Sequence, residues 1–394
     1  MRHGAAFLGI FGFVGVSLPF WPTLLASRGL SASTIGILLA IGPWLRFAVN
    51  PRIGVLADTR WGGRNVFVAF ASLLFAGSLL LLGSSATVWL LIASAVVMAV
   101  GFSPLASLAD ASALVHARDG YARTRLWGSV AFIACSLGLG RWLETHGVES
   151  VSTSIAIAAG VVVLTGALLP NARAAQAVPS HSSPAASALV NHSASVVPAP
   201  LPPLLGVCLL AGLLNSSHAI LYGFGTLHWR SLGISNGHVG MLWTIGVLAE
   251  IAVFTLADRL NDRSAARWLL WAACLGGLVR WCLLAFTTVF AWQVVAQLLH
   301  GATFACAHLG ILRRLSQIVP SEKMASAVTK VSGLGGGLAM GVGSLVAGVA
   351  FERYGGLSYV IAAGASLAAC VVLWFFSRPT RDHGDVSGSN QLLT

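Results

Sequence analysis

The chain has 394 residues, of which 56% are hydrophobic and only 9% are charged, against about 25% charged residues in an ordinary soluble domain. This composition argues against a soluble globular protein and indicates a membrane protein embedded in a lipid bilayer. The formal net charge of +11 would suit a nucleic-acid ligand, but its distribution along the chain is explained by membrane topology, and no nucleic-acid partner is expected.

Apolar stretches of about 20 residues, long enough to cross a hydrocarbon core of about 30 Å, recur from one end of the chain to the other. The first begins near Gly4; it is too long for a removable signal peptide and lacks a small-residue cleavage site. The polar breaks predict twelve transmembrane helices, at residues 4–27, 33–57, 65–84, 87–114, 124–142, 151–169, 203–226, 237–257, 268–286, 289–312, 325–350 and 357–376.

The positions of Lys and Arg predict the orientation, because these residues collect in cytoplasmic loops. With both termini in the cytoplasm, most of them fall at the inner ends of the predicted helices. The exceptions are Arg28, Arg141, Arg230 and Arg353 at the outer ends and Arg46 and Arg280 within helices. We therefore expect a multi-pass protein of a bacterial-type inner (plasma) membrane with both termini cytoplasmic.

Residues 170–202 are rich in Ala, Ser and Pro and carry a single Arg, which is typical of a flexible linker. This cytoplasmic linker would join an N-terminal six-helix bundle (1–169) to a C-terminal one (203–378), followed by a cytoplasmic tail (379–394). The six cysteines are scattered singly without a CxxC pair, so we interpret them as small core residues rather than metal ligands or disulfides. No cofactor or metal is expected.

An internal repeat relates the second and eighth predicted helices. When "RGLSASTIGILLAIGPWLRF" (28–47) is set above "LGISNGHVGMLWTIGVLAEI" (232–251), the identical pairs are Gly29 and Gly233, Ser31 and Ser235, Gly36 and Gly240, Leu38 and Leu242, Ile41 and Ile245, and Gly42 and Gly246. Parallel six-helix repeats of this kind are the architecture of major facilitator transporters, which hold substrate near the midplane between the two halves.

The same alignment sets Arg46 opposite Glu250. Each lies about 20 Å into its helix at 1.5 Å per residue, so both are expected near mid-membrane and facing the shared cavity. A lone ionised carboxylate in hydrocarbon costs a few kcal/mol of free energy. We therefore expect Glu250 to have a functional role. Arg46 could instead snorkel to an interface, although from that depth only with difficulty.

Two predicted hairpins bring further charged residues to matched depths. Asp110 and Arg125 are equidistant from a turn near residue 117, and Arg280 and His300 are equidistant from the turn at Phe290. Matched depth makes pairing possible in each hairpin. The alternative for Asp110 and Arg125 is that they are solvated at the cytoplasmic rim.

The charges within the helices leave one positive charge unmatched: Arg46, Arg125 and Arg280 stand against Asp110 and Glu250. Such a site would suit a substrate with one carboxylate held by an arginine fork. His218 lies in the same set of helices and could exchange a proton near neutral pH. Several tryptophans could stack on a planar substrate or anchor helix ends at the interface, namely Trp21, Trp44, Trp127, Trp229 and Trp243.

Five segments together resemble the phenylpropionate permease family of the major facilitator superfamily: "LPFWPTLLASRGLSASTIGILLA" (18–40), "FSPLASLADA" (102–111), "RLWGSVAF" (125–132), "LYGFGTLHWRSLGIS" (221–235) and "VLAEIAVF" (247–254). The resemblance covers nearly the whole chain except the linker and the tail. It implies an all-α membrane protein with twelve helices in two parallel six-helix repeats, which works as a monomer.

The loop "GVLADTRWGGR" (54–64) resembles the general signature of the superfamily, with one extra residue. This resemblance implies a cytoplasmic gate in which Asp58 and Arg64 form ion pairs that break as the cavity opens. The second half repeats "LAD" at Leu256 to Asp258, so we expect Asp258 and Arg259 to take the equivalent gating positions.

The chain is more distantly similar to lactose permease. That resemblance implies sugar-binding roles for Arg125 and Asp110, and proton-coupling roles for Arg280, His300 and Glu250. The tenth-helix carboxylate that carries the proton there corresponds here to Thr303, and a nearby lysine corresponds to Gln297. Glu250 is therefore the leading candidate for the proton carrier, with His300 as the alternative. Movement of its partners during alternating access would change the proton affinity of Glu250.

We predict a secondary active transporter, not an enzyme, that moves a small aromatic or other monocarboxylate with protons. Glu250, His300 and Arg280 would couple the proton; the predicted substrate-binding residues are Arg46, Asp110, Arg125, His218, Trp127 and Trp243. The alternative within transport is a proton symporter or an exporter of a neutral sugar or nucleoside. An intramembrane enzyme is disfavoured because the sequence has no HExxH motif, helical GxSxG motif or paired-aspartate motif; a non-transporting receptor is equally disfavoured.

Overall fold

The computed structural model describes residues 2–57, 61–84, 87–116, 121–170, 201–257, 264–320 and 323–376, which form helices and turns without any strand. The part of the predicted linker between 171 and 200, and the tail from 377 onward, lie outside the described residues. All six cysteines are free.

The first half of the chain folds into helices that run up and down through one bundle. Their bounds are α1 (Arg2–Ser27), α2 (Ala32–Ala48), α3 (Asn50–Leu56), α4 (Gly63–Gly83), α5 (Val88–Phe102), α6 (Leu105–His116), α7 (Tyr121–His146) and α8 (Ser150–Ala167). The predicted helix 33–57 is divided, because α2 and α3 meet at a bend of 50°. Pro51 lies in the first turn of α3, where its missing N–H costs nothing but where it cannot continue the preceding helix.

The second half follows the same plan. Its elements are α10 (Leu201–Ser216), α11 (Ala219–Ser231), α12 (Asn236–Ala257), α13 (Ala265–Phe286), α14 (Phe290–Leu298), the π-helical segment η3 (Gly301–Cys306), α15 (Ala307–Ile318), α16 (Met324–Val331), the π-helical segment η5 (Ser332–Ala339), α17 (Met340–Tyr354), the 3₁₀ turn η6 (Gly355–Ser358) and α18 (Tyr359–Phe376).

The described helices agree with twelve membrane crossings. Ten stretches are long and apolar enough to span a bilayer, and the bent pair α2 and α3 is an eleventh. One of the ten, Ser326–Phe376, has 51 residues, about 76 Å of helix, which is far more than one crossing needs. Gly355 divides this stretch, because its φ of 53° is a backbone conformation that favours glycine. The stretch therefore contains two crossings.

The surface of the bundle is apolar, as a bilayer requires. Large hydrophobic side chains are exposed along its outside, among them Trp89, Leu164 and Phe286. Smaller residues and aromatic rings such as Phe7, Phe20 and Phe67 fill the interior. Since exposed apolar patches of this extent are unfavourable in water, the outer face is the one that meets lipid.

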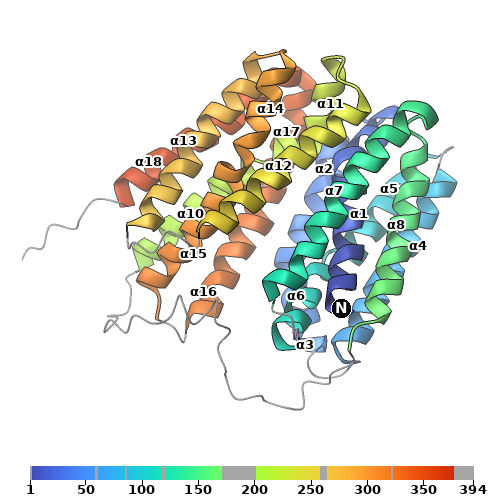
Figure 1. Cartoon of the computed structure of the whole chain (residues 1–394), viewed down its shortest axis with the longest axis horizontal. Coiled ribbons are helices and arrows are strands. Elements are labelled where there is room, and N and C mark those ends of the chain that lie inside the picture. Colours follow the sequence, from blue (N-terminus) through green and yellow to red (C-terminus); the bar gives the residue numbers. More distant parts are fainter. Residues whose placement is uncertain are drawn as a thin grey trace, which may run out of the picture.

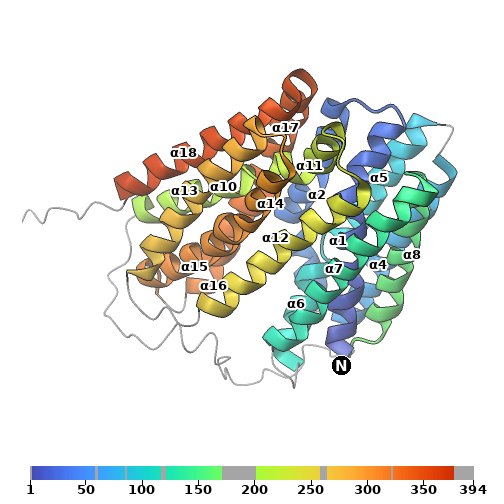
Figure 2. The ribbon, with the colours of Figure 1, turned by 45° about the horizontal axis from the view of Figure 1, so that its top comes forward.

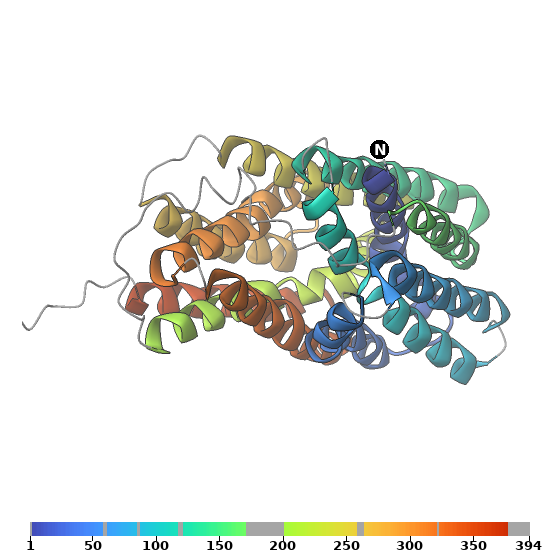
Figure 3. The same cartoon turned by 90° about the horizontal axis from the view of Figure 1, so that it is seen from below.

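The two halves of the chain lie side by side, as Figure 3 shows from the N-terminal end. In Figures 1 and 2 they meet at the end opposite the N-terminus and spread apart toward the N-terminal end. Two helix pairs make the main junctions between the halves, α2 with α17 and η5, and α7 with α12. The helices that the internal repeat relates, α2 and α12, are thus both junction helices.

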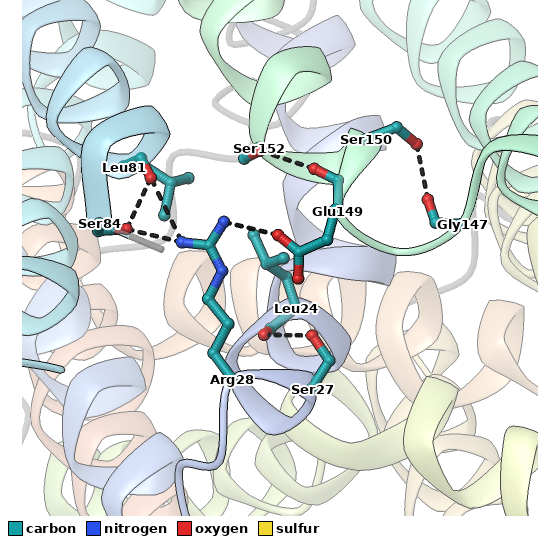
Figure 4. A network of polar contacts seen from close by, with 9 residues as sticks. All are labelled: Leu24, Ser27, Arg28, Leu81, Ser84, Gly147, Glu149, Ser150 and Ser152. Atoms are coloured by element: carbon teal, nitrogen blue, oxygen red, sulfur yellow. Dashed lines mark hydrogen bonds and ion pairs between the residues drawn. The ribbon is translucent and has the colours of Figure 1, made fainter. Parts of the chain in front are cut away.

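A polar network ties three helices of the first half together at the end opposite the N-terminus (Figure 4). Arg28, just after α1, donates to the Leu81 carbonyl (3.3 Å) and to the Ser84 hydroxyl (2.6 Å) at the end of α4. Its other terminal nitrogen donates to the Glu149 carboxylate (2.8 Å) before α8. The side chain of Arg28 is 9% exposed and that of Glu149 is 62% exposed.

Arg28→Gln is expected to lower the apparent melting temperature of the purified protein more than Glu149→Gln does. Removing the buried guanidinium takes away charge-assisted hydrogen bonds worth about 1.5–3 kcal/mol. Removing the charge of the exposed Glu149 costs about 0–1 kcal/mol. Thermal unfolding of both variants in the same detergent checks this ranking; equal shifts for the two variants would contradict it.

Candidate functional site

The buried guanidinium of Arg280 is the centre of a polar cluster in the second half. Arg280 lies on α13 and is completely buried. It donates to Thr303 Oγ1 (2.7 Å) and to Gln297 Oε1 (2.7 Å). Its Nη1 also lies 3.0 Å from His300 Nδ1, the pairing that the matched depths of the two residues predict. Three neutral side chains therefore surround this cation.

The tautomer of His300 follows from these contacts. Arginine has donors only, so Nδ1 of His300 accepts from Arg280, and the N–H of the neutral ring lies on Nε2. That Nε2 faces Glu250 Oε2 at 3.9 Å, which is too long for a hydrogen bond. His300 therefore stands between the arginine and the carboxylate as a neutral ring.

A chain of hydrogen bonds extends from Arg280 to a second histidine. Nε2 of His218 lies 3.2 Å from Thr303 Oγ1, and its Nδ1 lies 2.9 Å from the Leu214 carbonyl. Since a carbonyl only accepts, Nδ1 carries the proton, and Nε2 is an acceptor for the Thr303 hydroxyl, which also lies 3.3 Å from the His300 carbonyl oxygen. Gln297 donates in turn to the Leu242 carbonyl (2.9 Å). The cluster is thus a directed network of donors that begins at the guanidinium.

Glu250 reaches this cluster because two helices approach each other closely. It lies on α12 with 26% of its side chain exposed. Gly301, next to His300, lies against α12: a Cβ on Gly301 would be 2.7 Å from the Ala249 carbonyl oxygen. This contact falls in the π-helical segment η3, and π-bulges inside helices occur frequently at functional sites.

The first half carries a smaller charged cluster. Arg125 of α7 donates to Asp110 of α6 (2.8 Å), so the matched depths of these residues also correspond to a contact. The Tyr121 hydroxyl donates to the same carboxylate oxygen (2.8 Å) and accepts from Arg125 (2.9 Å). The Arg125 guanidinium lies 5.4 Å from the centre of the Phe11 ring, within the range of a cation–π contact.

The two clusters lie near each other across the junction of the halves. Arg125 is close enough to Glu250 for an electrostatic interaction between them, and the same holds for Arg125 and His308. The side chains of Arg125 and Asp110 are 45% and 31% exposed, so the first-half cluster is open to solvent or ligand.

Aromatic side chains border the second-half cluster. The His218 ring lies 5.6 Å from that of Tyr222, which in turn lies 6.2 Å from Trp243. The Trp243 indole donates to Thr226 (3.1 Å). The structure thus brings the predicted site residues His218 and Trp243 toward the same region as Glu250 and Arg280.

The structure does not join Arg46 and Trp127 to either cluster. Arg46 lies in the last turn of α2, before the bend, and has no hydrogen bond or ion pair with the described residues. Trp127 lines an apolar groove between α1, α7 and α8 with Leu8 and Ile157. It is two positions after Arg125, about 200° further around the helix, so it faces away from the charged pair.

Of the predicted gating residues, only Arg64 is described, at the start of α4. Asp58, Asp258 and Arg259 lie outside the described residues.

Three partners in these clusters were not among the predicted site residues: Tyr121, Gln297 and Thr303. Tyr121 had a detectable signal, since it precedes Arg125 by four residues and one helix face therefore carries both. Gln297 and Thr303 are neutral, and the sequence marks their positions only through the resemblance to lactose permease, which has charged residues there. Only the structure shows that both accept hydrogen bonds from Arg280.

Known proteins resemble this chain along most of its length. The model of the family described as "MFS_1 like family" matches residues 4–361. The chain is 31% identical over 367 residues to the Escherichia coli (strain K12) protein named "Probable 3-phenylpropionic acid transporter", covering 90% of this chain and 93% of that one. It is 26% identical over 392 residues to the maltose permease of Geobacillus stearothermophilus, covering 96% of this chain and 94% of that one.

Solved structures share the fold at low identity. The nucleoside transporter NupG superposes with a TM-score of 0.78 at 15% identity, covering 96% of this chain and 99% of that one. The peptide transporter PepTSo gives a TM-score of 0.70 at 12% identity and covers 96% of each chain.

Proposed function

Because the chain belongs to the MFS_1 like family, and is therefore a multi-pass membrane transporter of the major facilitator fold and not an enzyme, we propose that it carries a small aromatic or other monocarboxylate together with protons. The relative named for 3-phenylpropionic acid supports this substrate class. Carriers of this superfamily move small molecules between two six-helix halves.

The observation that carries the proposal is the environment of Arg280. A buried cation is costly unless an opposite charge pairs with it, yet its hydrogen-bond partners Thr303, Gln297 and His300 are all neutral. The carboxylate of Glu250 lies beyond His300. When Glu250 is protonated, no negative charge remains at this cluster. A substrate carboxylate bound there would supply one, and the fork of the guanidinium suits a carboxylate.

The same charges give a mechanism of coupling. When Glu250 takes up a proton, the cluster loses its negative charge and Arg280 is left unmatched. Binding of a monocarboxylate then restores neutrality, so that proton and anion bind together and leave together. Movement of one half relative to the other would change the distance between Glu250 and Arg125, and with it the proton affinity of the carboxylate.

Glu250 suits the role of proton carrier better than His300. For His300 to become a cation, its Nδ1 would have to hold a proton while facing the donors of Arg280 at 3.0 Å. That arrangement sets two donors and two positive charges against each other. Glu250 has no such conflict, and part of its side chain is accessible.

The proposal includes the orientation predicted from Lys and Arg, with both termini on the cytoplasmic side of a bacterial inner membrane. In this orientation the N-terminal end, toward which the halves spread apart in Figure 1, faces the cytoplasm. We expect the protein to act as a monomer, since each chain holds both halves of the site.

A ligand panel tests the substrate class. In thermal-shift measurements on the purified chain, 3-phenylpropionate is expected to raise the melting temperature at concentrations at least about tenfold lower than its neutral amide requires, whereas maltose and uridine are not expected to raise it. Uptake of labelled 3-phenylpropionate into proteoliposomes should then rise several-fold when the lumen is made more alkaline than the medium. Stabilisation by the neutral compounds alone would refute the monocarboxylate proposal.

A neutral sugar or nucleoside is the second candidate, because a maltose permease and a nucleoside transporter are among the similar proteins. The accessible Asp110, Arg125 and Tyr121 cluster offers the donors and acceptors that hydroxyl groups need. Competition by maltose or uridine against 3-phenylpropionate uptake would favour this candidate.

A further inference from the structure

Two glutamates cross between the halves at the end opposite the N-terminus. Glu144, near the end of α7, accepts from the backbone N–H of Gly237 in the first turn of α12 (2.9 Å). Glu352, near the end of α17, accepts from the backbone N–H of Ser33 in the first turn of α2 (2.7 Å). Each carboxylate therefore caps the N-terminus of a helix that belongs to the other half.

The internal repeat relates these two contacts. Ser33 and Gly237 are equivalent in the alignment of α2 with α12. A second pair of segments, "SLGLGRWLE" (136–144) and "SLVAGVAFE" (344–352), shares Ser, Gly and Glu at intervals of four residues. Glu144 and Glu352 are thus copies of one position, and both copies make the same contact across the junction.

Close helix packing beneath each glutamate makes the contact possible. A Cβ on Gly36 would lie 2.9 Å from the Gly348 Cα. A Cβ on Gly140 would lie 2.6 Å from the Asn236 carbonyl oxygen. Because the backbones approach this closely, the short side chain of a glutamate one turn further along reaches the first N–H groups of the opposite helix.

The chemistry of the contact suits reversible closure. A carboxylate at a helix N-terminus is attracted by free N–H groups and by the positive end of the helix dipole. Both glutamates are exposed, so water can replace each bond when it breaks. The contact therefore favours the closed junction without making it permanent.

We propose that Glu144 and Glu352 form a paired latch that holds the two halves together at this end, and that the chain must release both latches before the site can open there. Only the second part of this proposal, that both latches are released before the site opens, rests on the proposed transport function. The proposal adds gating residues at the end opposite the predicted gate of Asp58 and Arg64. The carboxylates of these residues bind backbone N–H groups and not arginine side chains.

Hydrogen–deuterium exchange of the purified full chain tests the latch directly, because the donors are backbone amides. In the double variant Glu144→Ala and Glu352→Ala, exchange in the first turns of α2 and α12 is expected to rise by about two- to fivefold, the effect of one exposed charge at a helix N-terminus. Each single variant should mainly affect the helix that it caps.

Glu149→Ala is the matched control, since Glu149 is an exposed residue near the same end whose carboxylate accepts from Arg28 of its own half. It should leave both first turns unchanged. The pair Glu144→Gln and Glu352→Gln, which keeps the shape of the side chains, should give a smaller increase in exchange than the alanine pair. Exchange in the alanine double variant equal to that of the Glu149→Ala control would overturn the proposal.

This readout needs no substrate. A positive exchange result together with absence of 3-phenylpropionate uptake would uphold the latch and reject the proposed substrate; the reverse pattern would do the opposite.

Discussion

Glu250→Gln is expected to abolish uptake driven by a proton gradient while leaving exchange of labelled for unlabelled substrate intact. Glu250 contributes a carboxylate beside the Arg280 cluster, with its Oε2 3.9 Å from His300 Nε2. A glutamine keeps the size and polarity of the side chain but cannot release a proton. Without a proton to exchange, the carrier can still move substrate down its gradient but cannot accumulate it.

The measurement is uptake into proteoliposomes with and without an imposed pH gradient, together with counterflow at equal pH on both sides. Concentrative uptake should fall several-fold, to the level that the wild type shows without a gradient. Glu149→Gln, which removes a carboxylate remote from the cluster, should keep the gradient response. If Glu250→Gln still accumulates substrate, the proton moves elsewhere, and His300 becomes the carrier to test.

The long-range pattern of the sequence predicted much of this site. Matched depth in a hairpin made pairing possible for Asp110 with Arg125 and for Arg280 with His300, and the structure has both contacts. The reason is geometric, because two antiparallel helices joined by a short turn bring equidistant residues to one level. Charged residues are also rare in apolar helices, so each one is a strong signal.

Side-chain direction was harder to predict. Trp127 shares a sequence segment with Arg125 but faces a groove on another side of α7. Arg46 is equivalent to Glu250 in the repeat, yet it ends a helix that bends by 50° while α12 continues. Small differences in helix phase or straightness, which a repeat does not encode, decide which residues meet.

The acceptors of Arg280 could not be predicted either, for a different reason. Gln297 and Thr303 are ordinary polar residues in an apolar helix and carry no charge that would mark them. Only the position of the buried guanidinium shows that each supplies an acceptor. The sequence does not mark the latch glutamates, because they lie at helix ends, where carboxylates are common. Their partners on the other half are known only from the structure.

Arg280→Gln should remove the ability of the site to distinguish an acid from its neutral amide. In the wild type we expect 3-phenylpropionate to bind at least about tenfold more tightly than 3-phenylpropionamide, because a charge-assisted bond to arginine contributes about 1.5–3 kcal/mol. The variant keeps polar groups but loses the cation, so the two ligands should bind alike. Arg280→Lys is expected to fail as well, since one ammonium cannot reproduce the fork that contacts both Gln297 and Thr303.

The measurement is the ratio of dissociation constants for acid and amide, taken from thermal shifts over a ligand titration in wild type and variants. A ratio is insensitive to general loss of stability, which would weaken both ligands equally. Arg230→Gln is the matched control, because Arg230 of α11 donates to the Ile234 carbonyl away from the cluster; it should preserve the ratio. If the Arg280→Gln protein still prefers the acid, the substrate carboxylate binds Arg125 and not Arg280. Replacing Arg125 should then remove the preference.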